Sequence, residues 1–392
     1  MSFPKMKLGE CAEIHSGSTP RTNNPDFWDG EITWVTPKDL SKLKSKFISK
    51  TESKITQLGF DSCSTKLLPE NSVLFSSRAP IGHVAINTIP MCTNQGFKSF
   101  VPKADLLDSQ YLYYWLKANK EYLQDLGVGA TFKEISKTVI ANVEIPLPPL
   151  AEQRRIASIL DQADELRQKR QQTIEKLDQL LQATFIDMFG DPEQNPKKWN
   201  KVILGDICDA KDRVNYGVVQ PGNDFEGGIP LIRVGDIDGG ILSFTSIKTI
   251  DPEIEKDYSR SRLKGNEILV SCVGSIGTIA KVPNKAIGFN IARAITRVPL
   301  QDKRIINFVA ECLKTEAIQN YFKKNTRTVS QPTLNVSFVK ETEIIFPNEE
   351  KILDFCKIVD KVEFQKELLQ KALVMQESLF QSLQNQAFNG SL

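Results

Sequence analysis

The chain has 392 residues, enough for two or three domains, and its 40% hydrophobic and 25% charged residues are typical of an ordinary globular protein. It contains no apolar run near the roughly 20 residues that cross a bilayer, and its first residues lack the apolar core of a signal peptide, so we expect a cytoplasmic protein with no membrane partner. Its seven cysteines stand singly without CxxC spacing, which argues against a disulfide framework or a metal site, and its net charge of +2 is informative only when divided by region.

Residues 1–149 predict a domain of mixed α and β structure. The runs Ser72–Phe75 and Val84–Ile89 are rich in β-forming residues and are bounded by Gly, Pro and Asn, as strands are. A helical pattern follows at Asp108–Leu126. The domain ends in the proline-rich run Ile145–Pro149, which stops a strand and suits the first turn of a helix.

Beyond these prolines, residues 150–196 predict one long amphipathic helix. The hydrophobic period changes there from two residues to three and a half, with Arg167 and Arg170 interrupting the apolar seam. The seam consists of Ile156, Leu160, Ala163, Ile174, Leu177, Leu181 and Met188. Such a seam predicts packing along one face against a second helix.

Residues 197–347 repeat the first 149 residues at a distance of about 196 positions. The matching segments are Leu8–Glu10 and Leu204–Asp206, Ile32–Leu40 and Ile229–Ile237, Pro69–Ala85 and Lys264–Ala280, and Asn94 and Asn290. This repeat is too long for a solenoid unit, so we interpret it as two whole domains of one fold. The copies keep their glycine and apolar positions but differ in most polar ones, which indicates one scaffold that recognises two different targets.

The second copy predicts the same kinds of element as the first. Strands are expected at Glu267–Cys272 and Thr278–Val282, and a helical pattern spans Lys303–Lys323. The exit is Ile345–Pro347. In both copies the glycines between the paired strands, at Ile81–His83 and Gly274–Gly277, predict a tight turn.

Residues 348–392 predict a second long amphipathic helix, with Lys366 and Gln376 interrupting its seam. The seam consists of Ile352, Phe355, Val359, Val362, Leu369, Leu373, Phe380, Leu383 and Ala387. Two seams of about five heptads each predict an antiparallel coiled coil between the helices, whereas separate packing of each helix on its own domain is the alternative. Some 36 residues at 1.5 Å each form a rod of roughly 55 Å, which would separate the two domains.

Charge is unevenly distributed along the chain. Residues 1–149 hold 17 basic and 15 acidic residues, residues 197–347 hold 22 and 17, and the two helical segments together hold 11 and 16. The globular copies are therefore basic and the helices acidic. Basic domains favour a double-stranded nucleic acid, because neutralised phosphates supply sequence-independent affinity, but an excess this small also fits an ordinary solvated surface.

The sequence offers little for catalysis. Only two histidines are present, and there is no GxxxxGK loop, no GxGxxG after a strand and no Asn-Pro-Pro-aromatic run. Asp39 with the triplet Glu52–Lys54 fits a short nuclease pattern, but the second copy lacks it and such patterns arise by chance in a chain rich in Lys and Glu. We therefore predict neither a catalytic residue nor a metal site.

The first copy contains the short segments Ser16–Pro20, Phe27–Gly30 and Ile32–Leu40, and the second contains Tyr216–Gly222 and Gly227–Ile237. The first set resembles the opening of a target-recognition domain from the specificity subunit of Type I restriction-modification systems, and the second set is similar to another branch of the same domain family. The exit Pro146–Ile156 and the ending Ala387–Leu392 are also typical, whereas the second exit, Pro347–Ile352, is three residues shorter. The resemblance covers essentially the whole chain.

The resemblance implies an α+β fold with two tandem target-recognition domains, separated by two long antiparallel coiled-coil helices about a pseudo-two-fold axis. It implies domain 1 at 1–149, a central spacer helix at 150–196, domain 2 at 197–347 and a C-terminal spacer helix at 348–392. It also implies a non-catalytic subunit whose domains each read one half of a split, asymmetric sequence in double-stranded DNA.

The family's partners and cofactors follow from the same resemblance. The helices would dock two methyltransferase subunits, which use S-adenosylmethionine, and the assembly would recruit restriction subunits that use ATP. This chain itself would bind neither cofactor. A coiled-coil protein-binding adaptor, or a self-contained nuclease or methyltransferase, remains the alternative.

Candidate base-reading residues are polar side chains in predicted loops, where contacts to base edges are available. In the first copy they are Thr19, Arg21, Lys38, Arg78, Asn94 and Gln95, and in the second Arg213, Gln220, Arg233, Arg262, Asn290, Arg293, Arg327 and Gln331. The lysines at positions 38, 42, 44, 46, 50 and 54 suit phosphates, which position a protein without specifying sequence. For each residue a solvated or ion-paired surface side chain is the alternative, and Trp28 and Trp34 are expected in the core.

Overall fold

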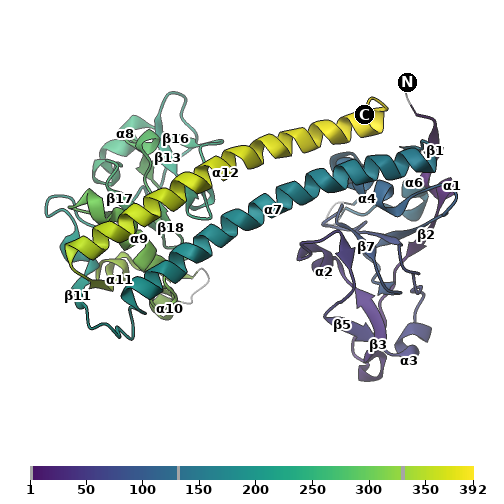
Figure 1. The fold of residues 1–392 in the computed structure, drawn as a ribbon, viewed down its shortest axis with the longest axis horizontal. Coiled ribbons are helices and arrows are strands. Elements are labelled where there is room, and N and C mark those ends of the chain that lie inside the picture. Colours follow the sequence, from purple (N-terminus) through teal and green to yellow (C-terminus); the bar gives the residue numbers. More distant parts are fainter. Residues whose placement is uncertain (1–2, 130–132, 328–331) are drawn as a thin grey trace. The chain divides into compact units, whose positions relative to one another are not determined.

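The computed structural model describes residues 3–129, 133–327 and 332–392, and within these ranges no helix is long and apolar enough to cross a membrane. The chain forms two compact units, Met1–Gln171 with Lys371–Leu392, and Gln172–Gln370. Two long helices, α7 (Leu150–Phe189) and α12 (Glu349–Asn389), each contribute residues to both units (Figure 1). Mixed α and β units and two long helices were predicted and are confirmed.

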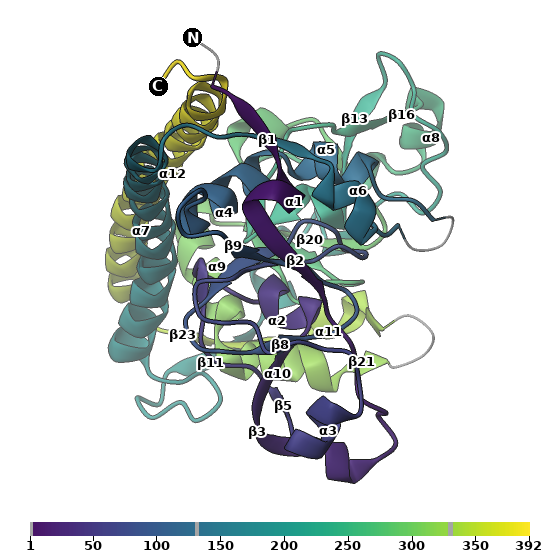
Figure 2. The ribbon, with the colours of Figure 1, turned by 90° about the vertical axis from the view of Figure 1, so that its right-hand side faces the viewer.

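The first unit contains a five-stranded sheet, in the order β2-β9-β6-β7-β4, and a three-stranded sheet, in the order β5-β3-β8. Figure 2 shows β2 and β9 side by side, and they pair antiparallel. A two-stranded sheet of β1 and β10 joins the start of the unit to its exit. The strands are β1 Lys5–Lys7, β2 Ala12–Ser16, β3 Trp28–Val35, β4 Phe47–Ile48, β5 Ser53–Ile55, β6 Val73–Phe75, β7 Val84–Asn87, β8 Cys92–Thr93, β9 Lys98–Pro102 and β10 Glu144–Pro146. The helices are α1 Leu8–Cys11, α2 Pro37–Ser41, α3 Gln57–Asp61, α4 Ser109–Ala118, α5 Lys120–Asp125 and α6 Lys137–Ala141, with the 3₁₀ turn η1 at Pro25–Phe27.

The second unit contains a four-stranded sheet, β12-β20-β17-β18, and a three-stranded sheet, β16-β13-β19. Strand β11 pairs with β23, β14 with β15 and β21 with β22. The strands are β11 Asn200–Ile203, β12 Asn215–Tyr216, β13 Ile229–Ile232, β14 Ile237–Asp238, β15 Ile241–Leu242, β16 Lys248–Ile250, β17 Glu267–Ser271, β18 Ile279–Lys281, β19 Asn290–Ile291, β20 Ile295–Pro299, β21 Thr326–Arg327, β22 Thr333–Leu334 and β23 Glu343–Phe346. The helices are α8 Pro252–Lys256, α9 Ile306–Lys314, α10 Glu316–Lys324 and α11 Val336–Lys340, and the 3₁₀ turns are η2 Leu204–Ile207, η3 Val234–Asp236, η4 Ser259–Ser261, η5 Asn284–Ala286 and η6 Lys303–Ile305.

The two units repeat one topology, as the sequence repeat predicts. The sheet β5-β3-β8 corresponds to β16-β13-β19, and each contains one antiparallel and one parallel pair. The order β2-β9-β6-β7 corresponds to β12-β20-β17-β18, and the pair β1 and β10 to β11 and β23. The glycine turns predicted between paired strands connect β6 to β7 and β17 to β18.

The registers correct one match of the sequence repeat. Asn94 and Asn290 were expected at corresponding positions, but Asn290 lies opposite Leu231 in the parallel pair of the second unit, where the first unit has Cys92 opposite Trp34. Between β7 and β8 the first copy is shorter than the second copy between β18 and β19, which contains η5. These extra residues shift the alignment, so Asn290 corresponds to Cys92.

Both long helices begin where their prolines predict. Helix α7 starts at Leu150, directly after Pro149. Helix α12 starts at Glu349, and the side chain of Asn348 accepts a hydrogen bond from the backbone N–H of Lys351 at 3.0 Å. That bond satisfies one of the N–H groups left unpaired at a helix start.

Within each unit, α7 and α12 run antiparallel. In the first unit Arg155 donates to the backbone oxygen of Leu392 at 2.9 Å, and Arg167 lies 3.9 Å from Glu377. In the second unit Asp178, which lies further along α7, pairs with Lys366 of α12. Residue numbers thus rise along α7 while those of their partners fall along α12.

The helices also pack on their own domains, which the coiled-coil pattern alone did not predict. Seam residues Ile156 and Phe380 are buried in the core of the first unit. At the end of α7, Phe185 and Phe189 fall outside the predicted seam, yet both rings are fully buried against Phe308 of α9. A helix that packs on a globular domain follows its own period of 3.6, so its buried face departs from the coiled-coil seam.

Candidate nucleic-acid interface

Four loops of the first unit meet at one surface, which we call the first junction. They are residues 17–21 after β2, 36–38 after β3, the β6–β7 hairpin at 76–83 and the β8–β9 turn at 94–96. Backbone hydrogen bonds hold them together: Ser18 N–H to Thr93 O at 2.9 Å, Asn94 N–H to Val35 O at 3.1 Å and Ser77 N–H to Gly96 O at 2.8 Å. Loops distant in sequence thus form one framework.

The second unit builds the same framework, the second junction, from residues 217–221, 233–235, 271–278 and 292–294. Its backbone hydrogen bonds are Val218 N–H to Ile291 O at 2.8 Å, Ala292 N–H to Ile232 O at 2.8 Å and Cys272 N–H to Ala294 O at 2.7 Å. These bonds match those of the first junction one for one. The loops that carry the divergent polar residues therefore rest on a shared backbone frame.

A glycine is required at the same point of each frame. A Cβ atom on Gly17 would lie 1.9 Å from the backbone oxygen of Asn94, and one on Gly217 would lie 1.7 Å from that of Ile291. No side chain fits where the first loop crosses the last. The glycines shared by the copies therefore reflect this close backbone approach.

A buried serine shapes the hairpin of each junction. The backbone N–H of His83 donates to Ser76 Oγ at 2.8 Å, and that of Thr278 donates to Ser271 Oγ at 3.1 Å. A glutamine then clamps each hairpin, with Gln124 donating to the oxygen of Ile81 and Gln319 to that of Gly277, both at 2.9 Å. The two hairpins thus share a serine anchor and a glutamine contact, but their tips differ in backbone as well as in sequence, because Gly274 has a positive φ and Ala79 does not.

The side chains carried by the two frames differ. By the shared hydrogen bonds, the first junction places Thr19, Thr36, Arg78 and Gln95 where the second has Val219, Arg233, Val273 and Arg293. Gln95 and Arg293 are exposed. Thr19 Oγ1 hydrogen-bonds the side-chain oxygen of Gln95, an arrangement with no counterpart between Val219 and Arg293. One backbone frame thus presents two unlike polar surfaces.

The first junction gathers most of the residues expected from the sequence. Thr19, Arg78, Asn94 and Gln95 lie in its loops, Lys38 lies in the first turn of α2 beside them, and Arg21 lies exposed at the end of the first loop. Asn94 uses its side-chain oxygen to accept from the backbone N–H of Gly96 at 2.9 Å, so it shapes the turn.

The second junction gathers fewer of them. Gln220, Arg233 and Arg293 lie in its loops. Arg327 is exposed on β21, and its partner across the strand pair, Thr333, bridges the hairpin at Val273. Arg213 and Arg262 lie outside these loops, and Gln331 lies outside the described residues.

Three of these side chains are already held by the protein. Asn290 is fully buried, accepts from Ser261 Oγ at 2.7 Å and donates to Glu255 at 3.0 Å. Arg262 pairs with Glu255, and Arg233 with Asp236, whose hydrogen bond raises the pKa of the Arg233 guanidinium. In this arrangement Asn290 has no side-chain atom left for a base edge.

The lysine run of the first copy is largely ion-paired. Lys38 and Lys42 pair with Glu52 at 3.7 and 2.8 Å. Lys46 pairs with Asp161 of α7 at 2.5 Å, and only 17% of its side chain is exposed. Lys46 is therefore less available to an external phosphate than the sequence pattern predicts.

The two tryptophans of β3 hold the first loop of the first junction through hydrogen bonds to its backbone. Trp34 is buried, its ring lies 5.0 Å from that of Trp28, and their indole N–H groups donate to backbone oxygens of Ser18 and Arg21. Their role in packing, rather than in base stacking, agrees with the sequence.

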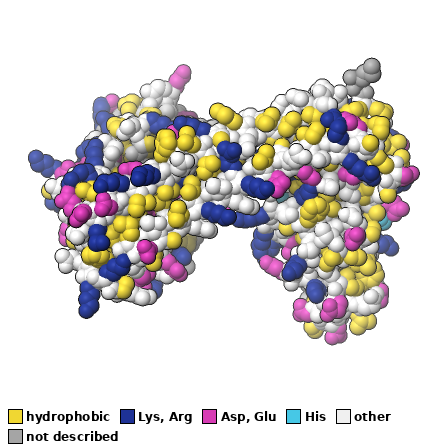
Figure 3. Space-filling view, in the orientation of Figure 1, with side chains coloured by type: hydrophobic (Ala, Val, Ile, Leu, Met, Phe, Trp, Pro, Cys, Tyr) yellow, Lys and Arg dark blue, Asp and Glu magenta, His cyan; other side chains and the backbone are white. Residues whose placement is uncertain are grey.

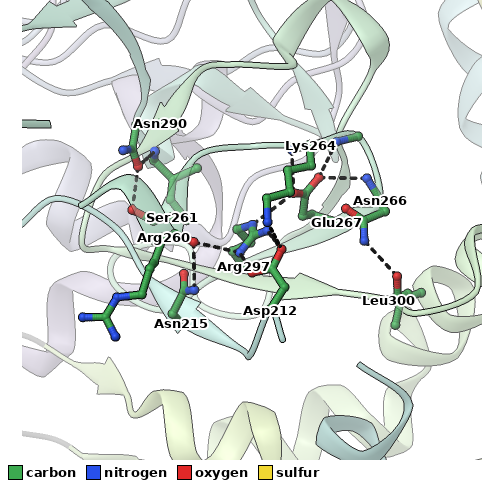
Figure 4. Close-up of polar contacts among 12 residues, drawn as sticks. Asp212, Asn215, Arg260, Ser261, Lys264, Asn266, Glu267, Asn290, Arg297 and Leu300 are labelled. Carbon is green, nitrogen blue, oxygen red and sulfur yellow. Dashed lines mark hydrogen bonds and ion pairs between the residues drawn. The ribbon is translucent and has the colours of Figure 1, made fainter. Parts of the chain in front are cut away.

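The second unit contains a buried ion cluster that the sequence did not reveal (Figure 4). Arg297 of β20 is fully buried and donates to Asp212 at 2.6 Å and to Glu267 at 3.0 Å. Burial raises the pKa of Asp212, but hydrogen bonds from Arg297 and Lys264 outweigh it and hold that pKa below its ordinary value. The only signal in the sequence was a charged residue inside the apolar strand Ile295–Pro299.

No metal or thiol chemistry emerges in the residues that the structure describes. Among them, no three His, Cys, Asp or Glu side chains are placed to hold a metal ion. Burial raises the pKa of the thiols of Cys92, Cys208 and Cys312 to about 12, which keeps them protonated and unreactive. On the face in Figure 3, basic and acidic side chains are interspersed over each unit.

Comparison with known proteins places these features in one family. The chain matches the family model described as "Type I restriction modification DNA specificity domain" at residues 2–176 and 196–373, one match for each copy. It is 32% identical over 378 residues to the Type I restriction enzyme MjaIX specificity subunit of Methanocaldococcus jannaschii, a match that covers 90% of this chain and 85% of that protein. It is 29% identical over 331 residues to the EcoBI specificity subunit of Escherichia coli, with coverage of 77% and 70%.

Solved structures share the fold. The S subunit of a Type I restriction-modification system from M. genitalium aligns with a TM-score of 0.53 at 18% identity, covering 98% of this chain and 96% of that one. A chain from a study of complex assembly and conformational transition of the type I R-M system aligns with a TM-score of 0.55 at 18% identity, covering 100% and 98%.

Proposed function

The chain belongs to the type I restriction-modification DNA specificity family, and from this premise we propose that its two junctions read the two halves of one asymmetric DNA sequence. Each junction would face the base edges of one half-site. The chain would itself be non-catalytic and would act in the cytoplasm, directing the chemistry of partner subunits.

The observation that carries this proposal is the pairing of one backbone frame with unlike side chains. Matching hydrogen bonds and glycines fix the loops of both junctions, while Gln95 stands where the other junction has Arg293. Glutamine suits the edge of adenine and arginine that of guanine, so the two frames favour different bases.

The two long helices would set the distance between the half-sites and dock two methyltransferase subunits. In the second unit, helix α12 exposes Phe364 and Leu368, which lie about one turn apart. In the first unit it exposes Met375 and Leu379, which are spaced in the same way. Each of these side chains is about half exposed or more, and exposed apolar pairs of this kind support a protein partner.

The methyltransferase subunits would supply S-adenosylmethionine chemistry, and restriction subunits would supply ATP-driven translocation and cleavage. The absence of phosphate-loop and methyltransferase motifs from the sequence supports assigning both cofactors to the partners.

Reconstitution tests the proposal directly. The full chain is mixed with the methyltransferase subunits encoded beside it, and the methylated positions in a library of random duplex DNA are sequenced. We expect a two-part asymmetric recognition sequence that appears only when the chain is present. Methylation by the chain alone, or the same sites without it, would contradict the proposal, and a protein-binding adaptor would leave the library unselected.

A further inference from the structure

The second copy differs from the first along the strand that leads into its junction. In the first unit β2 pairs without interruption along β9. In the second, Cys208 lies opposite Leu300, and the next pair is Asn215 opposite Arg297. Four extra residues therefore leave the strand between Cys208 and Asn215 and form a loop that the first copy lacks.

The buried ion cluster anchors this loop. Asp212, one of the loop's two carboxylates with Asp209, turns inward to Arg297 and accepts from Lys264 Nζ at 2.7 Å. Arg297 also reaches the backbone oxygen of Arg260 at 2.9 Å. In the first unit the residue opposite His15, equivalent to Arg297, is the buried Ser99. The cluster thus stands where the first copy has a small serine side chain, and it fixes two chain segments.

Beside the loop lies a pocket of about 650 Å³, which we call the β12 pocket. Three exposed cations line it, namely Lys211, Arg213 and Arg260, against one exposed carboxylate, Asp257. Figure 4 shows the side chain of Arg260 directed away from the ion cluster. The inward carboxylate is already paired, so the pocket keeps a positive balance.

The β12 pocket adjoins the second junction on two sides. Tyr216 lines the pocket and directly precedes Gly217, which begins the first loop of the second junction. Val336 also lines it, two residues after Leu334, whose N–H donates to the oxygen of Cys272 in the hairpin at 2.9 Å. A duplex lying on the second junction would therefore run past the pocket.

We propose that the β12 pocket binds a backbone phosphate of the duplex that the second junction reads. This inference rests on the proposed function and adds a contact that the first copy lacks. Phosphate contacts fix the register of a protein on DNA without specifying bases. The second copy, with 22 basic and 17 acidic residues against 17 and 15 in the first, would thus supply more of the sequence-independent affinity.

The test replaces two pocket cations by Lys211→Gln with Arg260→Gln in the full chain, assembled with its methyltransferase subunits. Loss of one phosphate contact should reduce the slope of log affinity against log salt by about 0.9 and weaken binding about fivefold at 0.15 M salt. The recognised sequence should not change. In phosphate-ethylation interference, one position beside the second half-site should block the wild-type assembly and no longer affect the variant.

The matched control is Lys201→Gln with Lys256→Gln, which removes the same charge from exposed residues of the second unit, paired with Glu343 and Glu253, outside the pocket. It should keep the wild-type slope and interference pattern. A wild-type slope in the pocket variant, or an altered second half-site, would overturn this inference alone. If the wild-type assembly selects no sequence, the proposed function fails instead.

Discussion

At the scale of single residues, we propose that base reading and stability depend on different side chains. Gln95 and Arg293 occupy equivalent, exposed places in their turns. Arg297, on the strand β20 that follows the last loop of the second junction, is fully buried and exposes no atoms to solvent. Substitutions of the two kinds should therefore affect different measurements.

Gln95→Ala should relax base preference only in the first half-site, and Arg293→Ala only in the second. A bidentate contact contributes about 1–3 kcal/mol of discrimination, so preference at one position should fall roughly 5- to 150-fold. Sequencing of methylated random DNA measures both halves at once, and each variant serves as the control for the other. Relaxation of both halves by one substitution would argue against separate junctions.

Arg297→Met should lower the free energy of unfolding by about 3–5 kcal/mol, because Glu267 would be left buried without its cation and Asp212 would keep only Lys264. Denaturant unfolding measures the change. Arg304→Met is the matched control, since Arg304 is 62% exposed and pairs with Asp302 and Glu349 at the surface. That variant should lose less than about 1 kcal/mol. Equal losses in the two variants would contradict the role of burial.

His83, at the base of the first hairpin, should titrate below its ordinary pKa of 6.5, because burial and then the charge of Lys120 both lower it. A lowered folded pKa means that its contribution to stability is complete above pH 6.5 and is lost as the pH falls through the folded value. NMR titration should show Lys120→Gln raising the midpoint only part of the way to 6.5. A midpoint at or above 6.5 in the wild type would be inconsistent with this environment.

At the scale of elements, the junction depends on how closely two loops cross. Gly17→Ala would place a Cβ atom 1.9 Å from the oxygen of Asn94, and the backbone must move to relieve it. We expect a loss of about 1–3 kcal/mol and faster hydrogen exchange in the loops of the first junction only. Gly235→Ala, which meets no atom within 4 Å, is the control. An unchanged rate of hydrogen exchange at residues 93–97 in the Gly17→Ala variant would refute the close approach of the two loops.

The two long helices are the largest elements of the fold, and their packing has two components. Each begins after a proline and packs both on its antiparallel partner and on the domain of its unit. Thus the two alternatives raised by the heptad pattern, a coiled coil or separate packing, both describe part of the helix surface.

At the scale of the whole molecule, the duplication makes each half-site separable. Exchange of residues 1–149 for the same segment of another family member should change one half of the recognition sequence and leave the other half unchanged. The reciprocal exchange of residues 197–347 should change only the other half. Methylation mapping of both hybrids measures this, and a change in both halves by either exchange would contradict independent reading.

The sequence by itself determined the duplication, the strand pairs around their glycine turns and the starting points of both helices. These features depend on local signals: hydrophobic period, proline and glycine, and the recurrence of one segment. The close match of Ser76 and Ser271 in their hairpins follows from the same repeat.

The tertiary structure alone decided which polar residues reach the surface. Asn94 and Asn290 look alike in sequence, but the extra residues around η5 move Asn290 into a buried strand, while Asn94 stays in a turn. Likewise the cluster of Arg297, Asp212 and Glu267 joins residues 30 and 85 positions apart. A local sequence pattern does not predict such distant contacts, because burial and ion pairing are properties of the packed chain rather than of any single segment.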